Sequence, residues 1–251
     1  MSRTQNFTVI AHRGASSYAP ENTFAAFDKA LDMDVRHIEL DVHFTDDGHI
    51  VVIHDDTVDR TTDGSGPVAS HTLSQLRSLD AGSWFGAEHA GERVPTLGEV
   101  LERYKGRLHF HIEIKARAEG LASRAADLVR GYGVADSVTI TSFQKPRLEE
   151  VRAHAPELRA GWLVPSGPGN QWDDSMMEQA RDLGLTQIGP RADLVTPELV
   201  AMLHDEGFIV HAWGVPSEGL MRRVVDAGVD GMTINFPDKL VEYLKERPGS
   251  D

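Results

Sequence analysis

The sequence predicts an α/β fold, a TIM (β/α)8 barrel with a small insertion after its second strand. Eight short runs rich in β-branched and aromatic residues recur along the chain, and amphipathic helical stretches lie between most of them. The length of 251 residues suits a single barrel of this kind. We therefore expect residues 1–251 to form one domain whose catalytic groups lie at the carboxyl ends of the strands.

The predicted elements follow one another in the order that a barrel needs. Several of the helical stretches end on glycine, which is favoured at a helix C-terminus. Strands are expected at 7–14, 37–44, 108–115, 137–143, 159–165, 187–191, 208–215 and 231–237. Helices are expected at 22–33, 122–133, 146–155, 174–184, 196–207 and 218–228.

Residues 45–107 interrupt this alternation. They contain a turn at "DDG", a strand "HIVVIHDD", a Gly/Ser/Pro-rich stretch "TTDGSGPVAS" and a helix near 96–105. We expect this segment to form a small lobe over the barrel mouth. The loop "SGPGNQW" at 166–172, after the fifth strand, is a second candidate for lining the entrance.

The composition excludes several classes of partner. The chain has 39 acidic and 25 basic residues, a formal charge of −14, so it lacks the basic surface that nucleic acid or an anionic membrane requires. The absence of cysteine excludes disulfides and thiolate metal sites. The first residues, "MSRTQNFTVIAH", lack the apolar run of a signal peptide, and no stretch approaches the length of a transmembrane helix. We expect a cytoplasmic protein without stable membrane insertion. The sequence does not indicate an oligomeric state.

Two of the expected strands carry ionisable residues at every second position. In "HIELDVHF" and again in "LHFHIEIK", one face is apolar and the other holds histidines and carboxylates. The spacing of His109 and His111 is also typical of zinc ligands. Both side chains should point into the barrel beneath Glu113, however, where hydrogen-bonded core histidines are the more common outcome.

The carboxylates on these faces predict a metal site. Parallel neighbours in register would bring Glu39, Asp41 and Glu113 to one point near the barrel mouth. Three clustered anions without a counter-ion repel one another, so a bound cation is expected, and oxygen ligands favour Mg²⁺ or Ca²⁺. The alternative is that these are solvated charges paired with Lys115 or Arg36.

Histidines follow two of the strands near the same point. The first strand ends in "AHRG", which places His12 and Arg13 at the mouth, and "VVIHDD" brings His54 from the insertion. Two imidazoles near a metal are able to divide the roles of general base and general acid, and an arginine offers a planar fork for phosphate. Each histidine alone is more often a buried, hydrogen-bonded residue, so the prediction depends on their convergence.

These segments resemble the glycerophosphodiester phosphodiesterase family. The similar blocks are "AHRGASSYAPENTFAAF", "HIELDVHFTDDGHIVVIHDDTVDRTT", "VPTLGEVL", "IEIK" and "GVDGMTINFPD", in order across nearly the whole chain. The resemblance implies a TIM barrel with an inserted lobe that uses a divalent metal to split glycerophosphodiesters into glycerol 3-phosphate and an alcohol. By position it implies Glu39, Asp41 and Glu113 as metal ligands, His12 and His54 as the acid/base pair, Arg13 and Lys115 beside the phosphate, and Phe143 and Trp213 as pocket walls, with Glu21 at the site edge.

The expected chemistry follows from these groups. The cation and the two basic side chains would neutralise the phosphodiester, while one histidine deprotonates the nucleophile and the other protonates the leaving alcohol. The nucleophile is either water or the glycerol hydroxyl of the substrate, which would first give a cyclic phosphate. The stretch "WGVP" at 213–216 departs from the "WTVN"-like stretch often found in the family, so the family pattern does not carry over to substrate preference.

Three alternatives remain at this level. A zinc hydrolase would need several histidine ligands at the mouth, and strand one lacks an HxH pair. A barrel that only binds a ligand would have no need for both histidines and three carboxylates. A lysophospholipid-cleaving relative would want an apolar rim or a membrane anchor, and neither is evident in the sequence.

Overall fold

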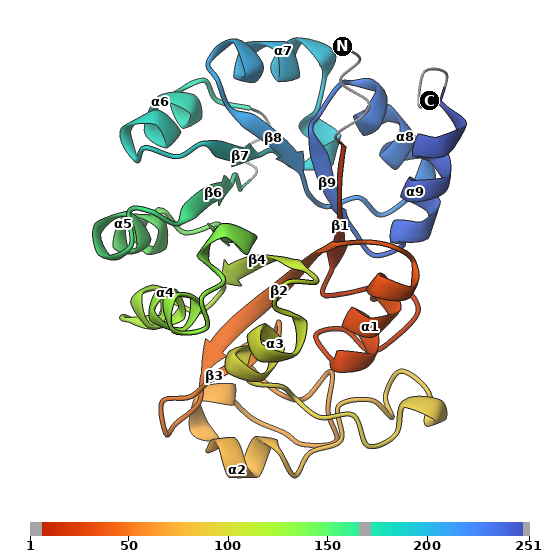
Figure 1. The fold of residues 1–251 in the computed structure, drawn as a ribbon, viewed down its shortest axis with the longest axis vertical. Coiled ribbons are helices and arrows are strands. Elements are labelled where there is room, and N and C mark those ends of the chain that lie inside the picture. Colours follow the sequence, from red (N-terminus) through yellow and green to blue (C-terminus); the bar gives the residue numbers. More distant parts are fainter. Residues whose placement is uncertain (1–6, 166–171, 248–251) are drawn as a thin grey trace.

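A closed parallel barrel forms the body of the protein. The computed structural model describes residues 7–165 and 172–247. In this part of the chain, hydrogen bonding runs in the order β1-β9-β8-β7-β6-β5-β4-β2, and pairing of β1 with β2 closes the barrel (Figure 1). Its strands are β1 (Thr8–His12), β2 (His37–Phe44), β4 (His109–Ile114), β5 (Val138–Ser142), β6 (Arg159–Leu163), β7 (Gln187–Gly189), β8 (Ile209–Ala212) and β9 (Gly231–Ile234).

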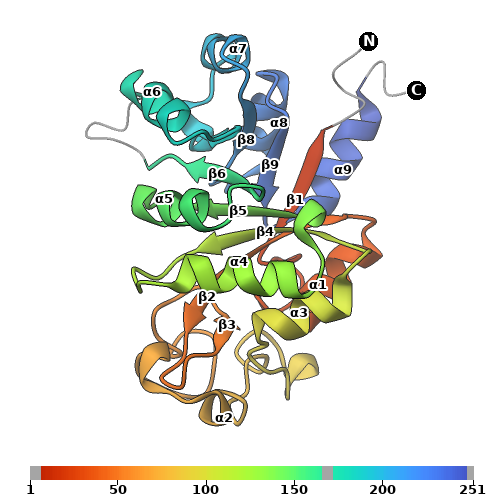
Figure 2. The same cartoon turned by 60° about the vertical axis from the view of Figure 1, so that its left-hand side comes forward.

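Helices surround the strands, as Figure 2 shows. Local sequence fixes their starts: the Thr23 hydroxyl accepts a hydrogen bond from the Ala26 amide at the first helix, and Thr96 and Glu99 form a capping box at another. The longer helices are α1 (Phe24–Asp32), α3 (Leu97–Tyr104), α4 (Leu121–Gly131), α5 (Lys145–His154), α6 (Ser175–Asp182), α7 (Pro197–Asp205), α8 (Glu218–Asp226) and α9 (Pro237–Glu246).

The alternation along β2 and β4 divides the barrel into an apolar outside and a polar inside. Ile38, Leu40 and Val42 are fully buried in the main core, which also includes apolar residues of the surrounding helices. The residues between them face the barrel interior. In the parallel register Glu39 pairs with His111, and Asp41 pairs with Glu113. The register therefore brings the acidic residues of the two strands side by side.

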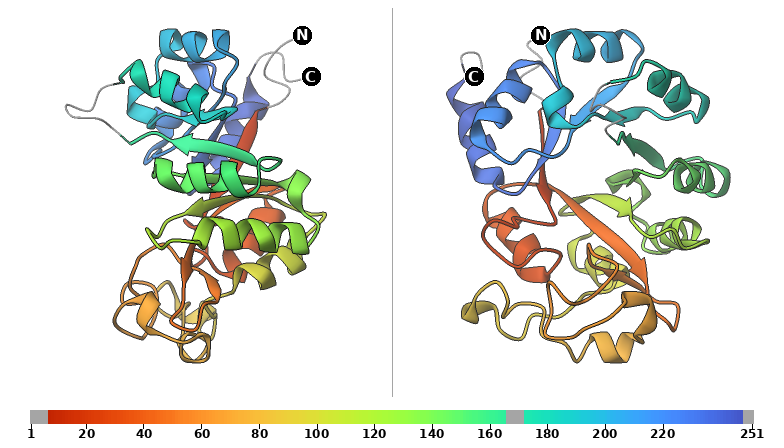
Figure 3. Two further views of the ribbon diagram at one scale, coloured as in Figure 1. Left: turned by 90° about the vertical axis from the view of Figure 1, so that its left-hand side faces the viewer. Right: turned by 180° about the vertical axis from the view of Figure 1, so that it is seen from behind.

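The segment between β2 and α3 lies beside the barrel (Figure 3). It contains β3 (Ile50–Val52), which pairs antiparallel with the end of β2, and a short helix α2 (Leu73–Leu76). Val51, Ile53 and Leu76 belong to a small apolar cluster separate from the main core. That residues 45–107 are an insertion within a single domain of residues 1–251 stays a prediction.

The expected fold is confirmed. All eight expected barrel strands are present, as are the expected helices. The helix α9 was not expected. Pro237, placed at the end of the last expected strand, instead begins this helix, where its missing amide costs nothing. The loop expected at the entrance falls mainly on residues 166–171, which lie outside the described residues. In the described ranges, no helix has the length and apolarity needed to cross a membrane. The cytoplasmic location stays a prediction.

Candidate active site

A pocket of about 410 Å³ opens at the carboxyl ends of the barrel strands. It contains most of the residues that the sequence analysis selected. Asp41 is fully buried and does not line it. The selected residues that do line the pocket are His12, Arg13, Glu39, His54, Glu113, Lys115, Phe143 and Trp213.

Three carboxylates converge at one side of this pocket. Glu39, Asp41 and Glu113 each place an oxygen within 4.8 Å of the others, and all three residues are at least 95% buried. Among the described residues, Glu39 Oε1 and Asp41 Oδ1 have no hydrogen-bond partner. Buried carboxylate oxygens without a partner are costly, so these two atoms are suited to a cation.

The pKa values of the carboxyl groups show that their negative charges are poorly compensated. Burial, together with the charge of Asp41, raises the pKa of Glu39 well above its ordinary value and that of Glu113 to about 7. Lys115 Nζ lies 3.2 Å from Glu113 Oε1 and 3.7 Å from Asp41 Oδ1, which offsets only part of the negative charge. The alternative pairing with Arg36 does not occur, because that exposed side chain binds Asp34.

The loop after β1 supports the carboxylates. The backbone amide of Arg13 donates to Glu39 Oε2 at 3.0 Å, and the side-chain amide of Asn22 donates to Asp41 Oδ2 at 3.0 Å. Arg13 and Asn22 both have φ near +58°, a backbone conformation that asparagine tolerates better than most residues. The cap of the following helix is made by the next residue, Thr23.

His12 lies between the carboxylates and the last strand. Its Nδ1 is 2.5 Å from Asn235 Oδ1, which can only accept, so Nδ1 carries the proton. Its Nε2 is 3.8 Å from Glu39 Oε2. Burial and the nearby Arg13 charge lower the pKa of His12 to about 4, so the ring is neutral near pH 7.

His54 belongs to a chain of charged groups that joins the inserted segment to the barrel. Its Nδ1 lies 2.5 Å from Asp55 Oδ1, and the same carboxylate accepts from Arg60. Arg60 also binds Glu21, which in turn accepts from Arg13 Nη1 at 2.8 Å. Burial opposes the ionisation of Glu21, but the hydrogen bonds from Arg60 and the charge of Arg13 prevail and lower its pKa to about 2.

An aromatic wall faces these polar groups. Phe143 and Trp213 meet edge to face with ring centroids 4.7 Å apart, and the indole of Trp213 donates to the carbonyl of Gly189 at 3.0 Å. Gly214 and Pro216, the positions of the "WGVP" departure, line the same pocket. The ring contact and the hydrogen bond hold two apolar rings in place on this side of the pocket.

The histidines expected inside the barrel lie there. His109 and His111 precede Glu113 on the same face of β4. As expected, both are hydrogen bonded: His109 Nε2 lies 3.0 Å from Thr139 Oγ1, and His111 Nε2 lies 3.2 Å from His37 Nδ1.

The sequence analysis did not select Asn22, Asp55, Arg60 or Asn235 as site residues. Each lies within or beside one of the quoted blocks, in "PENT", "HDDTVDR" and "INFP". Asp55 follows His54, Asn22 follows Glu21 and Asn235 follows the last strand directly, which was the available signal; Arg60 had no such neighbour. Their partners, however, depend on the closed barrel.

The fold and the pocket together define a barrel enzyme, since such enzymes hold their substrates at the carboxyl ends of the strands. Arg13 and Lys115 bring two positively charged side chains to the pocket. A family model described as the glycerophosphoryl diester phosphodiesterase family matches residues 12–239, and the chain belongs to this family. The predicted family and enzyme class, a phosphoric diester hydrolase, are thereby confirmed.

Similar proteins extend over the same length. A glycerophosphodiester phosphodiesterase of Caldanaerobacter subterraneus subsp. tengcongensis is 39% identical over 95% of this chain and 98% of its own. A phosphodiesterase of Oleispira antarctica, solved with the product sn-glycerol-3-phosphate, is 29% identical with a TM-score of 0.87 over 95% of this chain and 97% of its own. A glycerophosphodiester phosphodiesterase structure from Agrobacterium tumefaciens is 30% identical with a TM-score of 0.82, covering 94% and 99%.

Proposed function

We propose that this protein hydrolyses small glycerophosphodiesters to glycerol 3-phosphate and an alcohol, with a divalent cation held by Glu39, Asp41 and Glu113. The observation that carries the proposal is the pair of buried carboxylate oxygens, Glu39 Oε1 and Asp41 Oδ1, which have no hydrogen-bond partner in the described ranges. Glu39 lines the same pocket as the basic side chains and both histidines, and an oxygen of the buried Asp41 lies within 4.8 Å of one of Glu39. The family of the chain and the product bound by its Oleispira relative support the substrate class.

The donor set favours Mg²⁺ or Ca²⁺. The three candidate ligands offer only carboxylate oxygens, the ligands that hard cations prefer. A bound cation would supply charge neutralisation at a non-bridging oxygen of the phosphodiester. The Arg13 amide donates to Glu39 Oε2, and Asn22 donates to Asp41 Oδ2. These hydrogen bonds orient the other oxygen of each carboxylate toward the cation.

The basic side chains would bind the rest of the phosphate charge. Arg13 is anchored on both sides, by Glu21 at 2.8 Å and by Asp41 at 3.5 Å from its Nε. Lys115 is held between Glu113 and the ring of Phe143, 5.7 Å from the ring centroid. These contacts fix two cationic groups beside the carboxylates before substrate arrives, which is the condition for stabilising charge as it develops.

We assign His12 as the general base and His54 as the general acid. His12 is neutral near pH 7 with its proton on Nδ1, so Nε2 is able to take a proton from the attacking hydroxyl, of water or of the substrate's glycerol. The carboxylate of Asp55 lies against His54 Nδ1 and would stabilise its imidazolium, while Nε2 gives its proton to the departing alcohol. The bond from phosphorus to the alcohol oxygen breaks as the bond to the new oxygen forms.

A substrate panel tests the proposal. Glycerophosphocholine, glycerophosphoethanolamine, glycerophosphoglycerol and lysophosphatidylcholine should be offered with Mg²⁺ or Ca²⁺. Glycerol 3-phosphate is detected with a coupled dehydrogenase for the three deacylated diesters. Released choline, measured with choline oxidase, compares glycerophosphocholine with the lysolipid, whose cleavage leaves an acylated glycerol phosphate. We expect the three deacylated diesters to be cleaved faster than the lysolipid, because the acidic chain, with its formal charge of −14, suits water-soluble diesters. Faster cleavage of the lysolipid would assign the protein to lipid substrates, and no product from any diester would contradict the proposal.

A further inference from the structure

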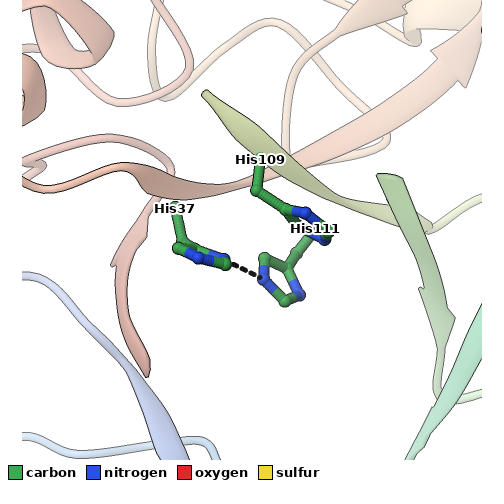
Figure 4. Close-up of side chains that lie close together, drawn as sticks. All are labelled: His37, His109 and His111. Carbon is green, nitrogen blue, oxygen red and sulfur yellow. Dashed lines mark hydrogen bonds between the residues drawn. The ribbon is translucent and has the colours of Figure 1, made fainter. Parts of the chain in front are cut away.

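Three histidine rings gather inside the barrel (Figure 4), toward the amino ends of β2 and β4. His37 and His109 begin β2 and β4, and His111 lies one inward-facing position further along. Each of the three offers a ring nitrogen within 4.8 Å of the other two. The rings of His37 and His109 stack with centroids 4.7 Å apart, and His111 is 5.0 Å from His109 and 5.5 Å from His37.

We propose that His37, His109 and His111 form a second metal site, which binds one borderline transition-metal ion, Zn²⁺ or the similar Co²⁺ and Ni²⁺. Imidazole nitrogen is the donor that these ions prefer, in contrast to the hard cations suited to the carboxylates. Nitrogen ligands about 2.0–2.1 Å from a tetrahedral zinc lie about 3.3 Å apart. The 3.2 Å hydrogen bond between His37 Nδ1 and His111 Nε2 already has this spacing, and metal binding would require the proton between these atoms to move to the other nitrogen of its ring.

Two neighbouring side chains, Thr139 and His211, also fit a metal site at these histidines. The Thr139 hydroxyl holds the His109 ring at 3.0 Å, as an outer partner holds a ligating imidazole. On the far side, the ring of His211 packs against His111 with centroids 5.8 Å apart. His211 is 8% exposed, and its Nδ1 has no hydrogen-bond partner in the described part of the chain. A buried polar atom of this kind is expected where a ligand or its water is missing.

A metal has a route to these histidines, and the opposing charge is weak. His37 and His109 are only partly buried at the amino ends of their strands, whereas His111 lines the substrate pocket. The guanidinium of Arg159 disfavours a cation here. This side chain is exposed, however, and turns to the carbonyl of Asp136 at 3.1 Å, so that water and salt screen its charge.

The experiment is a Zn²⁺ titration followed by calorimetry, in the presence of excess Mg²⁺ to occupy the carboxylates. We expect one equivalent of Zn²⁺ to bind the wild-type protein and Co²⁺ to give the visible absorption of a nitrogen-ligated, four-coordinate ion. His37→Gln and His109→Gln should each weaken binding by at least about tenfold, the lower end for losing even an outer-shell partner of a metal. Neither side chain lines the substrate pocket.

Two controls separate this site from the others. His154→Gln removes an exposed histidine that is paired with Asp127, and it should leave the Zn²⁺ equivalent unchanged. Asp41→Asn should weaken Mg²⁺ binding yet retain Zn²⁺, so failure of the proposed function and failure of this site give different results. X-ray absorption of the zinc-loaded wild type needs no variant and should show imidazole shells around the metal. No saturable Zn²⁺ binding under Mg²⁺, an oxygen-only shell, or binding insensitive to both glutamine variants would overturn the proposal.

Discussion

Asn22 donates its side-chain amide to Asp41 Oδ2 across 3.0 Å, while Asp41 Oδ1 is buried with no hydrogen-bond partner in the described ranges. One residue therefore orients the carboxylate so that a single oxygen is left for a cation. Asn22 is itself 3% exposed and has φ near +58°, so both its amide and its backbone conformation serve this contact.

We predict that removing this amide weakens the metal site. Asn22→Ala and Asn22→Gly should both lower the affinity for Mg²⁺ or Ca²⁺ by about 10–100-fold, the usual effect of losing an outer-shell partner. Glycine adopts a positive φ without strain, whereas alanine does not, so the pair separates the amide from the backbone. The measurement is the dependence of activity on cation concentration. Wild-type affinity in Asn22→Gly would show that the amide is not needed.

The histidine assignment predicts a dependence on the leaving group. His12→Ala and His54→Ala should each lose about 10²–10⁴-fold in kcat/KM on glycerophosphocholine, the usual contribution of a positioned proton transfer. A nitrophenyl phosphodiester leaves without needing a proton, so on this substrate His54→Ala should recover much of its rate and His12→Ala should not. Bound metal should be unchanged in both. The opposite selectivity would reverse the two roles, and near-wild-type rates in both variants would refute the mechanism.

Arg60 connects His54 to Arg13 through two carboxylates, Asp55 and Glu21. We predict that Arg60→Ala lowers kcat/KM by roughly tenfold, since an outer partner of a catalytic group commonly contributes this much. Steady-state kinetics on glycerophosphocholine measures the effect. Arg77→Ala is the matched control, because Arg77 lies in the same segment and binds Glu99, away from the pocket. Equal rates for the two variants would contradict a positioning role for Arg60.

The raised pKa of Glu113 predicts how stability without metal depends on pH. Because its pKa is about 7 in the folded protein against an ordinary 4.5, the folded state holds the proton more tightly between these values. The stabilisation from this group is present below pH 4.5 and is lost as pH rises through 7. Wild type should therefore lose stability relative to Glu113→Gln between pH 5 and 8 in chelator, measured by urea unfolding. A difference that stays constant with pH would contradict the raised pKa.

Much of the fold was predictable because its main signals are local. Alternating apolar positions define strands such as 37–44, and glycine and threonine mark helix ends, without reference to the rest of the chain. The α9 helix was missed because Pro237 is compatible both with the end of a strand and with the first residue of a helix. The amphipathic pattern of the residues that follow, with Asp238 in the first turn and Lys245 in the last, was the local signal for the helix.

The site residues were predictable where they lie on strands that share one sequence pattern. Glu39, Asp41 and Glu113 lie on two strands whose register follows from their shared pattern, so their cluster was expected and is present. Contacts such as His12 with Asn235 join residues 223 positions apart, and they arise only when the first and last strands pair. The gathering of His37 with His109 likewise required the observed register of β2 and β4.

The most direct test of this account is the activity of the exhaustively chelated protein on glycerophosphocholine, with metal content measured on the same sample. We predict that activity is lost with the metal and returns with Mg²⁺ or Ca²⁺, and that Asp41→Asn needs more cation for the same rate while it keeps its fold by circular dichroism. Full release of glycerol 3-phosphate from a sample shown by elemental analysis to hold no metal would contradict the carboxylate site on which the account rests.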